Sequence, residues 1–333
     1  MTVRVGLLGI GIIGKTHLQR GYQALMADGC DIRLEACFDL SEENLALAGN
    51  IRQYTDLDTF FAQERGKLDY IDICLPTFMH KDVAIRAMQA GFHVLCEKPM
   101  ALNPEDAQQM CAAAKETGKT LMIGQVLRFM RDFRLIYDYV QNQTLGKLRN
   151  IKYTSYGTGL PAGVNGWFLN RSLSGGPIVD VHVHDIDFLT WLLGKPESVC
   201  TFANAKAADG GYYAFSTNLR YPEQVFVNIQ CDWALPANVH DRGRIMRLDF
   251  EKGYLIFNPA GNLFVAVDEN GTETDLSEPD KPDGFYEEIR YFTDCLRQGS
   301  APEKCPPEQT ALAIRLIHTE IASADRGGEK IYL

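Results

Sequence analysis

The chain contains 333 residues, of which 46% are hydrophobic and 23% are charged, the balance of an ordinary soluble globular protein. Its length favours two domains over one. Its net charge of −10 at pH 7, without a local cluster of Lys or Arg, argues against nucleic acid and anionic membrane surfaces as partners.

Strands and helices are predicted to alternate in the first part of the chain. Five short segments predict buried strands: residues 3–8, 33–38, 70–75, 93–96 and 120–123. The segments between them predict helices at residues 14–26, 42–48, 81–90 and 104–117. This alternation is typical of βαβ units in a doubly wound parallel sheet. We therefore predict a first domain, of the Rossmann type, over residues 1–123.

The first predicted strand runs into a G-x-G-x-x-G sequence that opens a helix. In this motif the first glycine permits a tight turn, the second lets the backbone approach a pyrophosphate, and the third allows close packing of helix against strand. The helix N-terminus attracts the phosphates. The context predicts a dinucleotide-binding loop formed by Gly9, Gly11, Ile12, Ile13 and Gly14.

Asp39 closes the second predicted strand. A carboxylate here accepts hydrogen bonds from the adenosine ribose hydroxyls and repels a 2′-phosphate, and no Arg lies beside it. NAD(H) is therefore predicted in preference to NADP(H). The alternative is that Asp39 only caps the following turn, with Ser41 as the helix cap.

Lys98 lies in the sequence Cys96-Glu97-Lys98-Pro99, directly after a predicted strand. Open α/β sheets bind ligands at the carboxyl edge of their strands, so an amine at this position is expected close to a nicotinamide. The alternative is an ordinary surface charge.

The pattern changes after residue 124. Further helices are predicted at residues 129–143, 177–193, 285–297 and 309–324. Segments rich in β-forming residues, separated by turn signals, lie at 149–157, 198–203, 213–221, 224–232, 244–250, 253–258 and 263–268. They predict a C-terminal α/β domain over residues 124–333, with a large, mainly antiparallel, open sheet.

The predicted helix 177–193 carries several polar side chains on one face. Pro177 suits its first turn, and Gly194 supplies a stop. At about 100° per residue, Asp180, His184, Asp187 and Trp191 share a stripe, so that Asp180 and His184 can reach one substrate.

A strand is the alternative for residues 179–184, because the sequence also alternates there. It would align Asp180, His182 and His184 as a metal-like trio. The helix is favoured because its pattern continues to residue 193. No metal site is therefore predicted, and His182 is predicted to be a packing or hydrogen-bonding histidine.

Nine cysteines are spread along the chain without a C-x-x-C pair or a metal-finger spacing. An odd number of scattered thiols is typical of a reducing compartment, so a cytoplasmic location is expected. The apolar start, residues 3–13, lacks a basic segment and a cleavage site, which favours a buried strand over a signal peptide. No stretch approaches the roughly 20 apolar residues that a membrane-spanning helix requires.

Together these motifs resemble the Gfo/Idh/MocA oxidoreductases, named for glucose-fructose oxidoreductase, inositol dehydrogenase and a rhizopine-catabolism protein. The resemblance covers nearly the whole chain. It rests on the glycine loop, on Asp72-Ile73-Cys74-Leu75-Pro76-Thr77 with His80, on Glu97-Lys98-Pro99, and on Gly175-Gly176 followed by Asp180, His184 and Asp187. One departure is His182, where many members carry Gly.

The resemblance implies a Rossmann domain and a C-terminal domain whose open sheet mediates homodimers or homotetramers. It places Lys98, Asp180 and His184 at the active site. It also implies a cis bond before Pro99, and it extends the cofactor-binding set to Leu75, Pro76, Thr77, His80, Glu97 and Lys98. Weaker candidates for the substrate pocket are Arg128, Tyr156 and Trp167.

The expected activity is hydride transfer between NAD(H) and a secondary alcohol of a sugar, inositol or related polyol. His184 is the candidate base for the hydroxyl proton. Lys98 would hydrogen-bond the same oxygen, and Asp180 would orient the substrate or His184. Two alternatives stay open: an NAD-assisted glycosidase or lyase that oxidises its substrate transiently, and a non-catalytic nucleotide-binding sensor.

Overall fold

The computed structural model describes residues 2–158, 162–204, 210–235 and 243–333. Its contacts divide the chain into two units. Unit 1 contains Met1–Arg131 and Pro282–Ile314, and unit 2 contains Asp132–Lys281 and Arg315–Leu333. By contacts, residues 124–131 and 282–314 therefore group with the first unit. The functional division into residues 1–123 and 124–333 stays a prediction.

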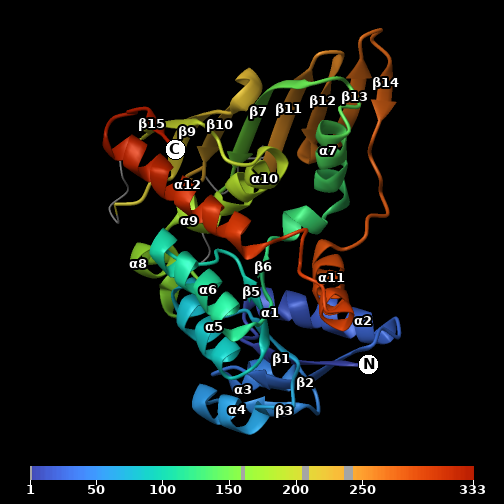
Figure 1. Cartoon of the computed structure of the whole chain (residues 1–333), viewed down its shortest axis with the longest axis vertical. Helices are drawn as coiled ribbons and strands as arrows, with labels where there is room; N and C mark the ends of the chain where they lie inside the picture. Colours follow the sequence, from blue (N-terminus) through green and yellow to red (C-terminus); the bar gives the residue numbers. More distant parts are fainter. Residues whose placement is uncertain (1, 159–161, 205–209, 236–242) are drawn as a thin grey trace. The chain divides into compact units, whose positions relative to one another are not determined.

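Unit 1 is built on a six-stranded parallel sheet (Figure 1). Its strands lie in the order β3-β2-β1-β4-β5-β6, which is the Rossmann order. The bounds are β1 (Val3–Leu8), β2 (Ile32–Phe38), β3 (Arg52–Tyr54), β4 (Tyr70–Ile73), β5 (His93–Glu97) and β6 (Leu121–Gly124). The predicted doubly wound parallel sheet is confirmed.

Helices flank this sheet (Figure 1). The first is continuous and contains a π-helical segment: α1 (Ile12–Thr16), η1 (His17–Gln23) and α2 (Ala24–Ala27). The others before residue 130 are α3 (Glu42–Ala46), α4 (Leu57–Glu64), η2 (Thr77–Met79), α5 (His80–Gln89), α6 (Pro104–Thr117) and η3 (Val126–Phe129). Much later in the chain, α11 (Gly284–Gln298) returns to unit 1 and packs against η1 and η3.

Local sequence signals account for the ends of these helices. In α6, the side chain of Asn103 accepts a hydrogen bond from the Asp106 amide, Pro104 occupies the first turn, and Gly118 ends the helix with a φ of +64°. In α11, the Asp283 carboxylate caps the first turn.

Unit 2 is built on a nine-stranded sheet in the order β14-β13-β12-β11-β7-β10-β9-β8-β15. The bounds are β7 (Leu148–Tyr156), β8 (Ser198–Ala203), β9 (Ala214–Arg220), β10 (Phe226–Asp232), β11 (Gly243–Phe250), β12 (Gly253–Asn258), β13 (Leu263–Asp268), β14 (Glu273–Asp275) and β15 (Ile331–Tyr332). All neighbouring pairs are antiparallel except β7 and β10. The predicted large, mainly antiparallel sheet is confirmed.

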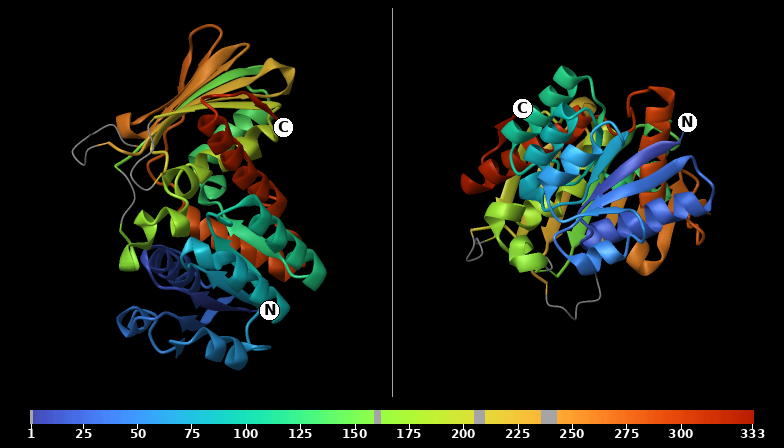
Figure 2. Two further views of the ribbon diagram at one scale, coloured as in Figure 1. Left: turned by 90° about the vertical axis from the view of Figure 1, so that its left-hand side faces the viewer. Right: turned by 90° about the horizontal axis from the view of Figure 1, so that it is seen from below.

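One face of this sheet is covered by helices and the other is open (Figure 2). The helical elements of unit 2 are α7 (Arg131–Gln141), η4 (Val164–Leu169), α8 (Arg171–Ser174), α9 (Pro177–Asp180), α10 (Val183–Leu193), η5 (Pro222–Gln224), η6 (Pro259–Gly261) and the later part of α12 (Pro307–Asp325). Within the described ranges, no helix combines the length and the apolar composition needed to cross a membrane.

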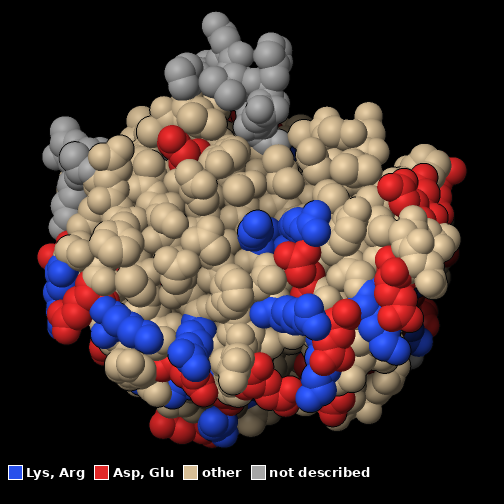
Figure 3. Space-filling view, turned by 90° about the horizontal axis from the view of Figure 1, so that it is seen from above, with Lys and Arg blue, Asp and Glu red and all other residues tan. Residues whose placement is uncertain are grey.

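The open face follows from the alternation of side chains along the strands. In β10, Val227, Ile229 and Cys231 are buried, whereas Phe226 and Gln230 are exposed. Figure 3 shows that uncharged residues predominate over much of this face and that most charged residues lie in the lower part of the view and along its sides.

Candidate functional site

The glycine loop at the end of β1 has the geometry of a dinucleotide cradle. Gly9 has a φ of +89°, which favours glycine. A Cβ at Gly14 would lie 1.9 Å from the Gly9 carbonyl oxygen, so no side chain fits where the helix meets the strand. A Cβ at Gly11 would meet no atom within 4 Å. Ile12 is 66% exposed beside it. The predicted turn and packing roles are confirmed, and the open side of the loop fits a pyrophosphate.

Asp39 is half-buried at the end of β2, and its carboxylate binds the surrounding backbone. Oδ2 accepts from the amide of Ile10 at 2.6 Å. Oδ1 accepts from the amide of Ser41 at 2.8 Å and from Nδ2 of Asn44 at 3.2 Å. Ser41 caps α3, as the alternative interpretation predicts. A carboxylate offers about four acceptor positions, so the same group is also compatible with a ribose hydroxyl.

His80 connects two of the predicted cofactor-binding loops. Its Nδ1 lies 2.8 Å from the Pro99 carbonyl oxygen, and its Nε2 lies 2.7 Å from the Leu75 carbonyl oxygen. Burial lowers the pKa of His80, although the two carbonyls act in the opposite direction. Leu75 and Pro76 are half-buried and Thr77 is buried. His80 therefore ties the backbone after β4 to the backbone after β5, which favours a positioning role.

The Glu97-Lys98-Pro99 turn follows β5 at the carboxyl edge of the sheet. The Lys98–Pro99 peptide bond is cis, as the resemblance implied. Glu97 is 3% exposed, and its Oε2 accepts from the Lys98 amide at 3.0 Å. Its Oε1 lies 2.9 Å from Nε2 of His17. Glu97 is thus engaged within the turn, which favours a positioning role over the predicted cofactor contact, while Lys98 is half-buried.

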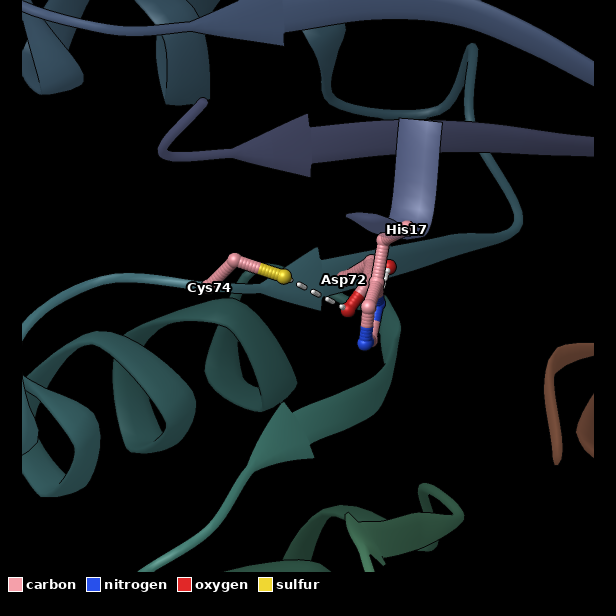
Figure 4. A group of neighbouring side chains, drawn as sticks. All are labelled: His17, Asp72 and Cys74. Atoms are coloured by element: carbon pink, nitrogen blue, oxygen red, sulfur yellow. Dashed lines mark hydrogen bonds and ion pairs between the residues drawn. The ribbon is translucent and has the colours of Figure 1, made fainter. Parts of the chain in front are cut away.

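His17 is fully buried in a cluster directly behind this turn, and Figure 4 shows it with Asp72 and Cys74. Its Nδ1 lies 2.8 Å from Oδ2 of Asp72 and its Nε2 lies 2.9 Å from Oε1 of Glu97. Asp72 also accepts from the Tyr22 hydroxyl at 2.7 Å and from the Cys74 thiol at 3.7 Å. The cluster joins the first helix to the carboxyl ends of β4 and β5.

The neighbours of His17 favour its charged form. Burial works against a charged ring, but Cys74 and Asp72 raise the pKa of His17 well above its ordinary value. Burial and Asp72 also raise the pKa of the Cys74 thiol, so this thiol stays protonated at neutral pH. A protonated His17 donates to both carboxylates at once.

Three groups of side chains in the described part of the chain lie close enough to hold a metal ion: His17, Asp72 and Cys74; His182, Asp185 and Cys231; and His17, Glu97 and Glu288. In each group, both ring nitrogens of the histidine already lie within hydrogen-bond distance of a carboxylate, a different one for each nitrogen. Hydrogen bonds thus account for the contacts of the two histidine rings in these groups.

The prediction of one helix over residues 177–193 is wrong in one respect. The structure has two helices, α9 and α10, separated at Val181 and His182. The amides of both Val181 and His182 lie 3.0 Å from the Pro177 carbonyl oxygen, whereas the His184 amide donates to Val181, three residues back. The helical hydrogen-bond register therefore changes at the break. The strand alternative is excluded, and the predicted start at Pro177 and stop at Gly194 are confirmed.

The break separates the two candidate catalytic side chains of unit 2. Asp180 is the last residue of α9 and is 6% exposed. His184 is the second residue of α10 and is half-buried. Asp187 is 1% exposed. Trp191, at the far end of the predicted stripe, stacks on Tyr137 at 4.1 Å. Along the stripe, Asp180 and Asp187 are therefore buried, whereas His184 and Trp191 are half-buried.

The weaker candidates lie in different surroundings. Arg128 is fully buried in unit 1, where it donates to the Lys304 carbonyl oxygen and to the Gln309 side chain. Tyr153 of β7 is buried. Tyr156 lies three residues further along the same strand, so its side chain lies on the opposite, open face of the sheet. Trp167 stacks on its neighbour Phe168 at 3.8 Å. Arg128 has the contacts of a structural residue.

Sequence reasoning identified the residues beside the buried clusters and missed much of the clusters themselves. His17 lies three residues after Gly14, and that spacing was the available signal. Asp185 was also overlooked, and its position next to His184 was the available signal. Glu320 and Arg244, which complete the cluster around His182, are distant in sequence, so no local pattern marks them.

Two models of one protein family match the chain. Residues 3–125 match the model described as an oxidoreductase family with an NAD-binding Rossmann fold. Residues 133–256 match the GFO/IDH/MocA C-terminal domain. The two matches together cover the glycine loop, the Glu97-Lys98-Pro99 turn and helices α9 and α10.

Curated relatives include sugar-modifying enzymes. D-glucoside 3-dehydrogenase of Escherichia coli strain K12 is 33% identical over 203 residues, which are 58% of this chain and 55% of the relative. 2,7-anhydro-N-acetylneuraminate hydratase of Mediterraneibacter gnavus is 26% identical over 224 residues, which are 67% of this chain and 58% of the relative. The chain thus matches little more than half the length of these relatives.

The fold also matches solved structures over the whole chain. Aldose-aldose oxidoreductase from Caulobacter crescentus, complexed with glycerol, has a TM-score of 0.86 at 23% identity, with 100% of each chain covered. At this level of identity the likeness concerns the fold alone.

Proposed function

Because the chain belongs to the GFO/IDH/MocA oxidoreductase family, we propose that it transfers a hydride between a nicotinamide dinucleotide and a secondary alcohol of a sugar, inositol or related polyol. The observation that carries the proposal is the glycine cradle at Gly9–Gly14, with the Glu97-Lys98-Pro99 turn at the same edge of the sheet. The sugar-directed names of the relatives support the substrate class.

The cofactor proposed is NAD(H) in preference to NADP(H). The family model covers an NAD-binding fold, and Asp39 ends β2 where an adenosine ribose is bound in Rossmann folds. A 2′-phosphate beside this carboxylate would meet a like charge. The bond from the Ile10 amide to Asp39 also holds the carboxylate against the glycine loop.

The protein's part in the reaction is to hold the alcohol and to take its proton. When bound, the nicotinamide supplies the hydride chemistry. We propose that His184 accepts the hydroxyl proton, because imidazole is a common general base and this side chain is half-buried and partly accessible. Lys98 is proposed to hydrogen-bond the same oxygen and stabilise its developing negative charge. Asp180 is proposed to orient the substrate or His184.

A second candidate is supported by one relative. The Mediterraneibacter gnavus protein is named a hydratase. A relative with this degree of similarity is therefore named for a reaction other than net oxidation. In that alternative, the same residues would act in a transient oxidation that ends without net NADH. The two candidates differ in a measurable product.

The proposed assembly is a homodimer or homotetramer formed through the open face of the nine-stranded sheet. Phe202, Phe226 and Tyr332 are 57%, 52% and 74% exposed, and uncharged residues predominate over much of this face (Figure 3). Exposed aromatic side chains on a face with few charges support an interaction surface. A cytoplasmic location is proposed because all nine cysteines are free thiols.

The test is a screen for NADH and NADPH formation over inositols, aldoses and sugar acids, followed by single-turnover hydride transfer on the best substrate. We expect NAD⁺ to be preferred, with the preference narrowed in Asp39→Ala. His184→Ala and Lys98→Ala should each lower the transfer rate by about 10² to 10⁴-fold, the range for a positioned acid or base. NADH affinity, measured by fluorescence, should change much less.

His318→Ala is the matched control, since His318 is also a half-buried histidine on a helix of unit 2. It should retain wild-type transfer. Normal transfer by His184→Ala would remove that residue from the chemistry. Release of an aglycone, or hydration, without net NADH would favour the second candidate.

A further inference from the structure

His182 occupies the break between α9 and α10 and is fully buried. Its Nδ1 lies 3.0 Å from Oδ2 of Asp185, and its Nε2 lies 3.1 Å and 3.3 Å from the two carboxylate oxygens of Glu320. Both ring nitrogens therefore face carboxylates, which only an imidazolium can satisfy at once. Asp185 lies on α10 and Glu320 lies on α12, so the ring links the break to a helix 138 residues away in sequence.

The cluster extends from the break into the sheet. Oδ1 of Asp185 accepts from the Tyr153 hydroxyl of β7 at 2.8 Å and from Nε of Arg244 of β11 at 2.6 Å. The Cys231 sulfur of β10 lies 3.5 Å from Nδ1 of His182. The Phe215 ring of β9 packs against the imidazole at 4.8 Å. Residues of four strands and of α12 thus meet at the break between α9 and α10. Within that cluster, Asp185 lies between His182 and Arg244 and contacts both side chains.

The charge of His182 is consistent with this geometry. Burial works against a charged ring, but Glu320, Cys231 and Asp185 raise the pKa of His182 well above its ordinary value. Arg244 and His182 hold the pKa of Asp185 below its usual range, although burial acts in the opposite direction. The titratable groups that face the ring are two carboxylates and a thiol, and the Asp185 carboxylate in turn binds the guanidinium of Arg244 and the phenol of Tyr153.

Such a cluster is a costly way to stabilise a fold. Buried ion pairs often contribute little net stability compared with apolar packing, and their best-attested use is to select one arrangement over others. Here the arrangement selected is the change of register at Val181 and His182. This change sets the angular relation of Asp180, at the end of α9, to His184, at the start of α10.

We propose that His182 is a positioning residue: with Glu320 and Asp185, it fixes the break between α9 and α10 and thereby the placement of Asp180 and His184. The proposal rests on the proposed function, in which these two side chains act on the substrate. Displacing a reacting group by about 1 Å costs roughly 10²-fold in rate. His182 acts through its neighbours and is assigned no contact with the substrate.

The test compares His182→Gln, Glu320→Gln and the double variant with Thr217→Val. Thr217 is also fully buried in unit 2, but its hydroxyl pairs with that of Thr201, between strands β8 and β9. We expect kcat to fall roughly 10 to 100-fold in both single variants, with KM and NADH affinity nearly unchanged. The double variant should lose no more than the single variants, because the two residues act as a unit. Thr217→Val should keep wild-type kcat.

A second measurement does not depend on turnover. Hydrogen exchange followed by mass spectrometry should show faster exchange at residues 181–185 in His182→Gln and Glu320→Gln, and not in Thr217→Val. Wild-type kcat in both cluster variants would overturn the proposal, and so would faster exchange spread evenly over unit 2. If wild type turned over none of the sugars or polyols while the local exchange change was present, the proposed function would fail and the fixing of the break would stand.

Discussion

Each unit of the molecule buries one histidine between two carboxylates, next to a residue proposed for the chemistry. In unit 1, His17 bridges Asp72 and Glu97, and Lys98 follows. In unit 2, His182 bridges Asp185 and Glu320, and His184 precedes Asp185. The same local device therefore supports two different structures, a turn after a parallel strand and a break between two helices.

The two clusters differ in their balance of charge. Around His17, Asp72 and Glu97 lie within hydrogen-bond distance of one imidazole and the buried Glu288 lies nearby, and the other donors to Asp72 are neutral groups. Around His182, Arg244 supplies a second cation, so two carboxylates face two cations. The comparison teaches that a buried carboxylate pair can be balanced by one shared histidine or by one cation for each acid, and that the first solution depends more on its histidine.

The largest effect is expected from removing each histidine. His17→Gln leaves both Asp72 and Glu97 without a cation, so unit 1 should lose about 3–5 kcal/mol of unfolding free energy. His182→Gln leaves Arg244 on Asp185, and the loss in unit 2 should be smaller by about 1.5–3 kcal/mol, the value of a hydrogen bond to a charged group. Urea unfolding of the two variants tests this order.

The two units can be followed separately, because all three tryptophans, Trp167, Trp191 and Trp233, lie in unit 2. Tryptophan fluorescence therefore reports on unit 2, and hydrogen exchange of strands β4 and β5 reports on unit 1. Equal losses in the two variants, or a larger loss for His182→Gln, would break the comparison.

A smaller effect is expected from pH. The pKa of His182 is raised on folding, so its contribution to stability is complete below the unfolded pKa of about 6.5 and is lost as the pH rises toward the folded pKa. Above pH about 6.5, the unfolding free energy of unit 2 should fall with rising pH more steeply in the wild type than in His182→Gln, by at most about 1.4 kcal/mol per pH unit.

Urea unfolding followed by tryptophan fluorescence at five pH values measures both slopes. Parallel slopes in wild type and variant would mean that His182 is neutral in the folded protein, and the charge-balanced description of its cluster would then be wrong.

The smallest effect is expected at an exposed ion pair of the same sheet. Arg247 and Asp249 pair at 2.8 Å on β11, with side chains 43% and 26% exposed. Asp249→Ala should change the unfolding free energy of unit 2 by only about 0–1 kcal/mol, because solvent screens such pairs. A loss of unfolding free energy as large as that of His182→Gln, in the same urea experiment, would show that burial does not explain the larger stability contribution of the clusters.

Much of the fold followed from local patterns. The strands of the Rossmann sheet are short and apolar, and those of the second sheet alternate, so their positions could be predicted to within a few residues. The short strand β3 and the helix α4 were missed, because Arg52 and Gln53 are exposed and no apolar pattern marks a three-residue edge strand. The return of α11 to unit 1 was also missed, since its partners lie far away in sequence.

The candidate site was predictable where the residues of one short motif determine the local backbone geometry. Gly9 and Gly14 act as the spacing predicts, and the cis bond before Pro99 is present. The break at His182 was not predictable, because the contacts that hold it come from Glu320 and Arg244. Tyr156 illustrates the reverse case: strand alternation from Tyr153 already assigns it to the open face, although it was considered as a pocket residue.

The return of α11 has a consequence for the order in which the protein is made. Unit 1 is encoded in two pieces, and its second piece ends at Ile314. At a synthesis rate of about 5–20 residues per second, residues 132–314 take roughly 10–40 s to follow the first piece from the ribosome. During this interval α11 is missing, and with it the Phe285 ring that packs 5.6 Å from His17. The nascent Rossmann sheet therefore completes its packing only once α11 is made, after most of unit 2 has been translated. The N-terminal unit thus starts folding first and finishes late.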